Sequence, residues 1–247
     1  MKHQASSIRL WMLPLAAIGL LSGGQNNFLG ADPATRSQAI ISSASQSLTT
    51  DKGKFRDKVN GRQVGSEDFD IAPDGTDWVA RATAEIKGDS GPSTHITSLL
   101  RLRADGTPSH YEWSTEGPKK ASATIDFDNG TATIQLQLPG KHPFTQQLMF
   151  KTPRVAILDD NLYHQYSFLA DLYDWSKKGP QDIPVLIPQE MTPGSVTVEA
   201  LDPEQSGGKN LTRLRVHSQD LDLMLYFDDG RLVRISVPSS NAEIVRE

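Results

Sequence analysis

Between Phe55 and Glu247 the sequence consists almost entirely of short segments in which apolar and polar residues alternate, each closed by a turn dipeptide. Side chains on a strand point alternately to the two faces of a sheet, so this alternation indicates strands with one buried and one solvated face. In Asp77–Lys87, for example, Trp78 and three alanines alternate with polar residues. The pattern predicts an antiparallel sheet, and it specifies no reaction.

The turn dipeptides between these segments are Asn-Gly or Asp-Gly, which tolerate the positive φ angles of tight hairpins. They are Asn60-Gly61, Asp74-Gly75, Asp105-Gly106, Asn129-Gly130 and Asp229-Gly230. The segments that they separate predict about eleven strands, enough for one large curved sheet or an incomplete β-barrel. The predicted fold class is therefore mainly β.

Two segments depart from the alternation. Ile183–Ile187 contains Pro184, which has no N–H to donate, so this strand is predicted to lie at an edge of the sheet. In Val155–Trp175, apolar residues recur every three or four positions, which predicts one long helix. A helix inside a run of antiparallel strands has to pack on the sheet, and we expect it on the concave face.

The N-terminal region has the features of a secretory signal. Lys2 and Arg9 precede the 12-residue apolar run Leu10–Leu21, which is too short to span a bilayer comfortably. We predict a cleaved signal peptide at residues 1–24, with an uncleaved anchor as the alternative, and no transmembrane span in the mature chain. Residues 25–54 are rich in Ser, Thr and Ala and predict a linker, or a weak helix around Gln38–Ser47. Residues 55–247 are predicted to form a single β domain.

The chain has no cysteine. A bacterial lipoprotein needs one at its cleavage site, so a lipid anchor of that kind is excluded, as is a disulfide framework. We therefore expect a periplasmic or secreted protein without a lipobox. The formal net charge of −5 and the lack of a long basic run argue against a nucleic-acid partner.

The string Gly88-Asp89-Ser90-Gly91-Pro92 is similar to the nucleophile loops of chymotrypsin-like proteases and of GDS-type esterases. A chymotrypsin-like triad requires a histidine earlier in the chain, and the only one is His3, inside the predicted signal. The esterases need a late Asp-x-x-His, which the sequence lacks. We interpret the string as a hairpin turn.

No two histidines have the spacing of a local metal site, so the sequence predicts neither a metal nor another cofactor. Asp160 and His164 would share one face of the predicted helix. A surface hydrogen bond is the simpler interpretation of this pair. The alternative is an acid–base pair in a hydrolase with a dispersed site.

The buried face of the sheet carries many alanines, and small side chains there leave space that must be filled. The helix could fill part of this space and an apolar ligand the remainder. The alternative is a solid core formed by the same aromatic and aliphatic side chains. The residues expected to line a ligand site are Trp78, Trp113, Leu158, Leu162, Tyr166 and Leu169.

The order of elements over roughly Phe55–Val245 resembles exported half-barrels of the LolA/LppX type, which have a signal, about eleven antiparallel strands and few helices on the concave face. In addition, Leu158-Asp159-Asp160-Asn161-Leu162-Tyr163-His164 and Val185-Leu186-Ile187-Pro188-Gln189-Glu190 resemble segments of uncharacterised envelope proteins of Gram-negative bacteria. The half-barrels carry lipids or lipidated proteins between membranes, so the resemblance implies amphiphile binding. Those carriers usually have a second, N-terminal helix, for which Gln38–Ser47 is the one candidate.

We therefore expect a non-enzymatic exported protein that holds a lipid or acyl chain between the concave sheet and the helix. One alternative is an envelope protein-interaction module with a solid core, which binds a protein partner through an edge strand near Ile183–Ile187. The other is the hydrolase based on Asp160 and His164.

Overall fold

The computed structural model describes residues 48–87, 91–118, 120–219 and 221–247, and within these residues fifteen strands form one sheet. The first eight strands are β1 (Asp51–Val59), β2 (Arg62–Asp74), β3 (Asp77–Ile86), β4 (Thr94–Leu102), β5 (Pro108–Glu116), β6 (Ala121–Asp128), β7 (Thr131–Gln137) and β8 (Phe144–Met149). The other seven are β9 (Ala156–Ile157), β10 (Gln181–Ile187), β11 (Thr192–Ser206), β12 (Lys209–His217), β13 (Asp222–Asp228), β14 (Arg231–Val237) and β15 (Ala242–Arg246). The prediction of a mainly β, antiparallel fold is confirmed.

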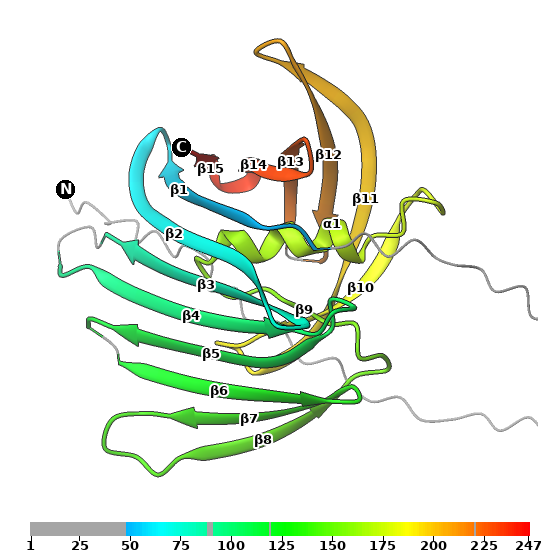
Figure 1. Cartoon of the computed structure of the whole chain (residues 1–247). Helices are drawn as coiled ribbons and strands as arrows, with labels where there is room; N and C mark the ends of the chain where they lie inside the picture. The colour runs from blue at the N-terminus through cyan, green and yellow to red at the C-terminus, as the bar shows by residue number, and fades with distance from the viewer. Residues whose placement is uncertain (1–47, 88–90, 119, 220) are drawn as a thin grey trace, which may run out of the picture. The chain divides into compact units, whose positions relative to one another are not determined.

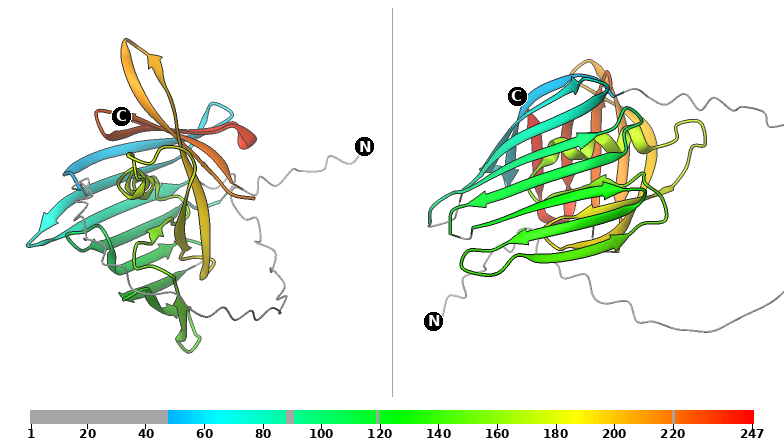
Figure 2. Two further views of the ribbon diagram at one scale, coloured as in Figure 1. Left: turned by 90° about the vertical axis from the view of Figure 1, so that its right-hand side faces the viewer. Right: turned by 60° about the horizontal axis from the view of Figure 1, so that its bottom comes forward.

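Neighbours in the sheet are neighbours in sequence, with one exception: the last strand, β15, pairs with the first, β1. The order runs β8 to β1, then β15 to β9, as in a barrel that has been opened between β8 and β9. The strands curl around a short helical segment (Figure 1), and the two further views show that segment inside the curve (Figure 2). The edges of the sheet are therefore β8 and β9.

The prediction of about eleven strands was too low. The alternation did not reveal β8, β9 and β15. In β8 the inward row contains Gln146 among apolar residues, β9 is only two residues long, and β15 is a short strand at the end of the chain. These strands depend on pairing with partner strands more than on their own pattern.

The long helix predicted at Val155–Trp175 was also wrong. Its first residues form β9, which pairs in parallel with β10, and Asn161 then adopts a left-handed φ of 64°. The 3₁₀ turn η1 (Tyr163–Ser167) and the helix α1 (Phe168–Leu172) follow. Parallel strands require a connection that crosses the sheet, and residues 158–180, here called the crossing segment, provide it. The periodic apolar residues are buried, but along an irregular path.

Two predicted boundaries also shift. The predicted edge strand at Ile183–Ile187 is part of β10. Its residues Val185 and Leu186 pair with the two residues of β9, so β9 and not β10 is the edge strand of the sheet. The strand β1 begins at Asp51, inside the predicted linker of residues 25–54. The predicted signal peptide and the weak helix at Gln38–Ser47 lie outside the described residues.

The Asn-Gly and Asp-Gly hairpins are confirmed where the chain reverses between paired strands. Asn60, Asn129 and Asp229 have φ angles of 51°, 46° and 49°, and each is followed by a glycine with positive φ. Two consecutive residues with positive φ form the turn that matches the twist of a hairpin. Strands β3 and β4 also pair as antiparallel neighbours, as expected if Gly88–Pro92 forms a hairpin turn. Residues 88–90 of that turn lie outside the described residues.

Candidate functional site

Seven polar side chains are buried where the crossing segment meets the concave face of the sheet. They are Asp57, Glu67, Tyr111, Asp159, Tyr163, His164 and Gln165, here called the polar cluster. Strands β1, β2 and β5 contribute three of them, and the chain around η1 contributes the other four. Buried polar groups are costly unless they are hydrogen-bonded, so the partners within this cluster decide what it can do.

Glu67 is the centre of the polar cluster and is fully buried. One carboxylate oxygen accepts hydrogen bonds from the backbone N–H groups of Tyr163 and His164, at 2.8 and 3.1 Å. The other oxygen lies 2.5 Å from Nδ1 of His164. A single carboxylate thus receives the first two N–H groups of η1, which the turn itself leaves unpaired. Glu67 fixes the start of the helical segment to β2.

Two further contacts tie the crossing segment to the sheet. The hydroxyl of Tyr163 donates to Asp57 at 2.8 Å, and burial raises the pKa of Asp57 despite this hydrogen bond. The hydroxyl of Tyr111 donates to Asp159, whose pKa is raised well above its ordinary value chiefly by burial. Burial therefore favours the neutral acid at Asp159. The side chain of Gln165 spans the same region, because it accepts from the backbone N–H of Asp159 at 2.7 Å.

The imidazole of His164 is held in place by two aromatic rings in addition to Glu67. Phe69 stacks on its imidazole and Phe168 meets it edge-on, with ring centroids 5.8 and 6.4 Å away. Its Nε2 is buried and has no hydrogen-bond partner among the described residues. The predicted pairing of Asp160 with His164 was wrong, since the imidazole pairs with Glu67 and the intervening chain is not a regular helix.

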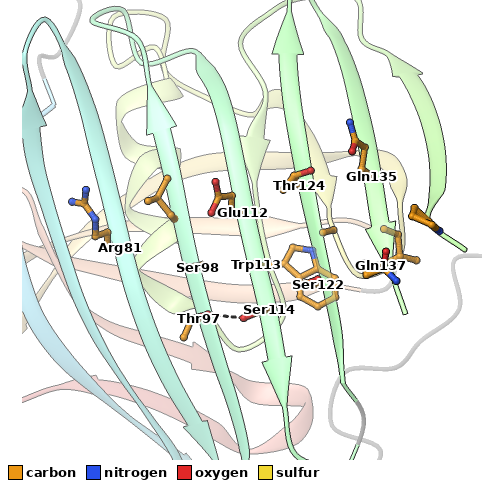
Figure 3. A pocket seen from close by; sticks show the side chains of 14 residues that line it. Arg81, Thr97, Ser98, Glu112, Trp113, Ser114, Ser122, Thr124, Gln135 and Gln137 are labelled. Carbon is orange, nitrogen blue, oxygen red and sulfur yellow. Dashed lines mark hydrogen bonds between the residues drawn. The ribbon is translucent and has the colours of Figure 1, made fainter. Parts of the chain in front are cut away.

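A hollow of about 440 Å³ lies on the opposite, solvent-facing side of strands β3–β7 (Figure 3). Most of its lining side chains belong to the outward-facing rows and are uncharged, with Arg81 and Glu112 as the ionisable groups. Thr97 and Ser114 hydrogen-bond to each other across two neighbouring strands at 2.7 Å. The hollow shares no lining residue with the polar cluster or with the crossing segment, so it differs from the expected apolar space under the helix.

An apolar row crosses the inner face of strands β5–β8. The pairing registers place Trp113, Ala123, Leu136 and Phe144 next to one another in this order. Trp113 and Ala123 are buried, Leu136 is partly exposed, and Phe144 at the edge is 49% exposed. The indole Nε1 of Trp113 is buried, and no described residue forms a hydrogen bond with it. At its outer end, this inward row therefore offers apolar surface to a molecule from solution.

The structure separates the six residues predicted to line a ligand site. Leu158, Leu162, Tyr166 and Leu169 are buried within the crossing segment. Trp78, at the start of β3, is only half-buried. Trp113 belongs to the inward row and, of the six, is the residue that also lines the hollow.

Sequence reasoning missed both Glu67 and Phe144. Glu67 could have been found, because it stands in the same alternating row as Phe69 and Ile71, where an apolar residue is expected. Asp57 gives the same signal between Phe55 and Val59. Phe144 gives none, since the strand that carries it does not alternate cleanly.

In the described part of the chain, no group of three or more metal-ligating side chains could hold a metal ion, and no helix is long and apolar enough to cross a membrane. No known family model matches the sequence, and no curated protein matches it. Among solved structures, a beta-barrel-like protein of Brucella abortus, described as a domain of unknown function (DUF1849), is similar with a TM-score of 0.54. The match is 9% identical in sequence and covers 81% of this chain and 95% of that one, and the description of that protein names no enzymatic activity. The similarity shows that the two chains share a fold.

Proposed function

We propose that this chain is exported to the periplasm or secreted, has no enzymatic activity, and binds the apolar chain of a lipid or other amphiphile on its concave face. The inward row of Trp113, Ala123, Leu136 and Phe144 supports this location. The space beneath the crossing segment is less suitable, because the polar cluster and buried apolar side chains occupy it. The proposed site thus lies closer to edge strand β8 than the sequence suggested.

The observation that carries the proposal is the solvent exposure of the inward row, which rises from the buried Trp113 and Ala123 through Leu136 to Phe144 at the edge. An acyl chain laid across Phe144 and Leu136 would remove their apolar surface from water, which is the dominant favourable term in such binding. The small side chain of Ala123 leaves room beside Trp113. An ester or carboxylate oxygen of the ligand would also supply the acceptor that the indole N–H lacks. The resemblance to LolA/LppX-type carriers remains a prediction consistent with this site.

The test is the uptake of a fluorescent fatty acid by the purified protein, together with native mass spectrometry after gentle extraction. We expect a bound mass, and we expect Phe144→Gln to weaken fatty-acid binding about tenfold, because it removes apolar contact area. Met149→Gln is the matched control, since Met149 is 84% exposed on the outer face of the same strand.

A single ligand-free mass together with no uptake of the fatty acid would contradict the proposal. Equal losses in Phe144→Gln and Met149→Gln would move the site away from the inward row. The export part is tested separately, by measuring the intact mass of the chain recovered from the periplasmic fraction. We expect a mass that lacks residues 1–24.

A second candidate function is the protein-interaction module, which the filled space beneath the crossing segment favours. Such a module would act through an edge strand of the sheet. Of the two edge strands, β8 is six residues long and β9 only two, so β8 is the better candidate. It predicts that fatty acids do not bind and that crosslinkers placed on β8 capture a protein in the envelope.

A further inference from the structure

The edge strand β8 has backbone groups that no strand of the described sheet uses. The N–H of Phe150 donates to Gly130 at 2.7 Å, which shows that the even-numbered residues of β8 face β7. In an antiparallel ladder, alternate residues bond to alternate sides. The N–H and C=O groups of Thr145, Gln147 and Met149 therefore point away from the sheet, and none of the described residues pairs with them.

Within the residues that the structure describes, this edge also lacks the usual protection against pairing with another strand. Natural edges carry an inward charge, a proline, a bulge or a covering element. The segment Phe144–Phe150 contains no charged residue and no proline, and its pairing with β7 shows no register shift. The other edge, β9, is only two residues long and is buried.

The ends of this segment are symmetric about Gln147, since Phe144 and Phe150 lie three residues to either side of it. Reading outward from Gln147, the pairs are Gln146 with Leu148, Thr145 with Met149, and Phe144 with Phe150. Two copies of the segment placed antiparallel around a two-fold axis at Gln147 would bring phenylalanine against phenylalanine on the inner face. Such a self-complementary contact is what an isologous dimer requires.

We propose that β8 pairs with β8 of a second copy of this chain, antiparallel and centred on Gln147, to form a two-fold symmetric dimer with one continuous sheet. The unused N–H and C=O groups of Thr145, Gln147 and Met149 bond to those of the partner copy. This register places Lys151 opposite Pro143 and Lys141 opposite Pro153, so no like charges face each other. Assembly stops at two copies, because the dimer has used both β8 edges and β9 is too short to extend it.

This proposal rests on the second candidate function, the protein-interaction module, and makes a second copy of the chain the partner that binds β8. It does not depend on amphiphile binding. The absence of cysteine from the chain gives a direct test. In the proposed register the two Gln147 Cα atoms lie about 5.5 Å apart. This separation is within the range that a disulfide spans. We expect Gln147→Cys in the full chain to form a disulfide-linked dimer on mild oxidation. Gln135→Cys, on the exposed outer face of β7, should not.

A proline at position 147 gives the second test. It removes an N–H that the fold does not use, so the monomer should remain folded while each copy loses one donor to the partner. We expect Gln147→Pro to raise the dimer dissociation constant about thirtyfold in sedimentation equilibrium. Gln147→Ala keeps the N–H and should leave the dissociation constant within about threefold.

Monomeric wild-type protein at all concentrations, or equal crosslinking of the two cysteine variants, would overturn the self-pairing. If Gln147→Cys crosslinks only to a different envelope protein, the self-pairing fails while the edge-binding function survives. Circular dichroism of Gln147→Pro confirms that its sheet is intact. If that sheet is lost, the cysteine pair decides the matter alone.

Discussion

Glu67 and Asp57 are carboxylates at inward-facing positions of the sheet where an apolar side chain is expected. Glu67 shares its row with Phe69 and Asp57 lies between Phe55 and Val59, and both carboxylates receive hydrogen bonds from the crossing segment. A buried acceptor of this kind contributes little net free energy but is expensive to leave unmatched. The two carboxylates thus fix the position of the crossing segment on the sheet, because hydrogen bonds are directional and apolar contacts are not.

Replacing Glu67 by Gln tests this anchoring role. The amide presents a donor to at least one of the groups that now donate to Glu67, so we expect a loss of about 3 kcal/mol in the free energy of unfolding. Asp68→Asn is the matched control on the exposed face of the same strand, where an ion pair with Lys54 is worth well under about 1 kcal/mol. Urea unfolding measures both, and equal effects would refute the anchoring role.

At the scale of the elements, the hairpins depend on the backbone conformation of their glycines. Gly130 has a φ of 82°, and a Cβ there would lie 2.9 Å from the carbonyl oxygen of Phe150, in the chain that follows β8. We expect Gly130→Ala to cost about 2 kcal/mol of unfolding free energy, since it combines a strained φ with a backbone clash.

Gly140 provides the comparison for this prediction. Its φ is 68°, but a Cβ there would have no heavy atom within 4 Å. Gly140→Ala should therefore lose only the conformational part, about 1 kcal/mol. Thermal or urea unfolding of the two variants separates the contributions, and identical losses would show that the contact with Phe150 is relieved without cost.

The elements that the sequence predicted are those governed by local rules. Alternation and Asn-Gly turns depend on neighbouring residues, so strands such as β6 and β7 and the turn at Asn129 were predicted correctly. The crossing segment was not, because β10 holds Ala156 and Ile157 in a ladder that overrides their helical spacing. For the candidate site, the inward position of Trp113 followed from alternation. Its neighbours in the row required the pairing register of four strands, which local sequence does not encode.

At the scale of the whole molecule, stability should depend on pH through carboxylates that folding removes from water. Burial raises the pKa of Asp160 from 3.8 to about 6, with a smaller effect from nearby Glu190, and burial alone does the same at Asp171. Between these two values the folded state binds more protons than the unfolded chain. The contribution of each group to stability is therefore greatest in acid and declines as pH rises from about 4 to about 6.

The variant Asp160→Asn should lack its share of this decline. We expect it to match the wild type in stability near pH 4 and to exceed it above pH 7, by no more than about 3 kcal/mol because Asp160 is partly exposed. Asp229→Asn, at an exposed hairpin turn, controls for the loss of one negative charge. Urea unfolding across this pH range provides the measurement, and parallel curves for Asp160→Asn and wild type would contradict the expectation.

The pairing of β15 with β1 also constrains the order in which the molecule can form. Arg246, one residue from the end of the chain, binds the Asp51 carboxylate at 2.7 Å and lies 5.2 Å from the ring of Phe69. The hairpins on either side of this joint can form from local sequence, but they remain two separate sheets until the final strand arrives between β1 and β14. When a chain is delivered from its N-terminus, the two halves of the sheet therefore join only once residues 242–246 are available, and until then the edge of β1 lacks its partner strand β15.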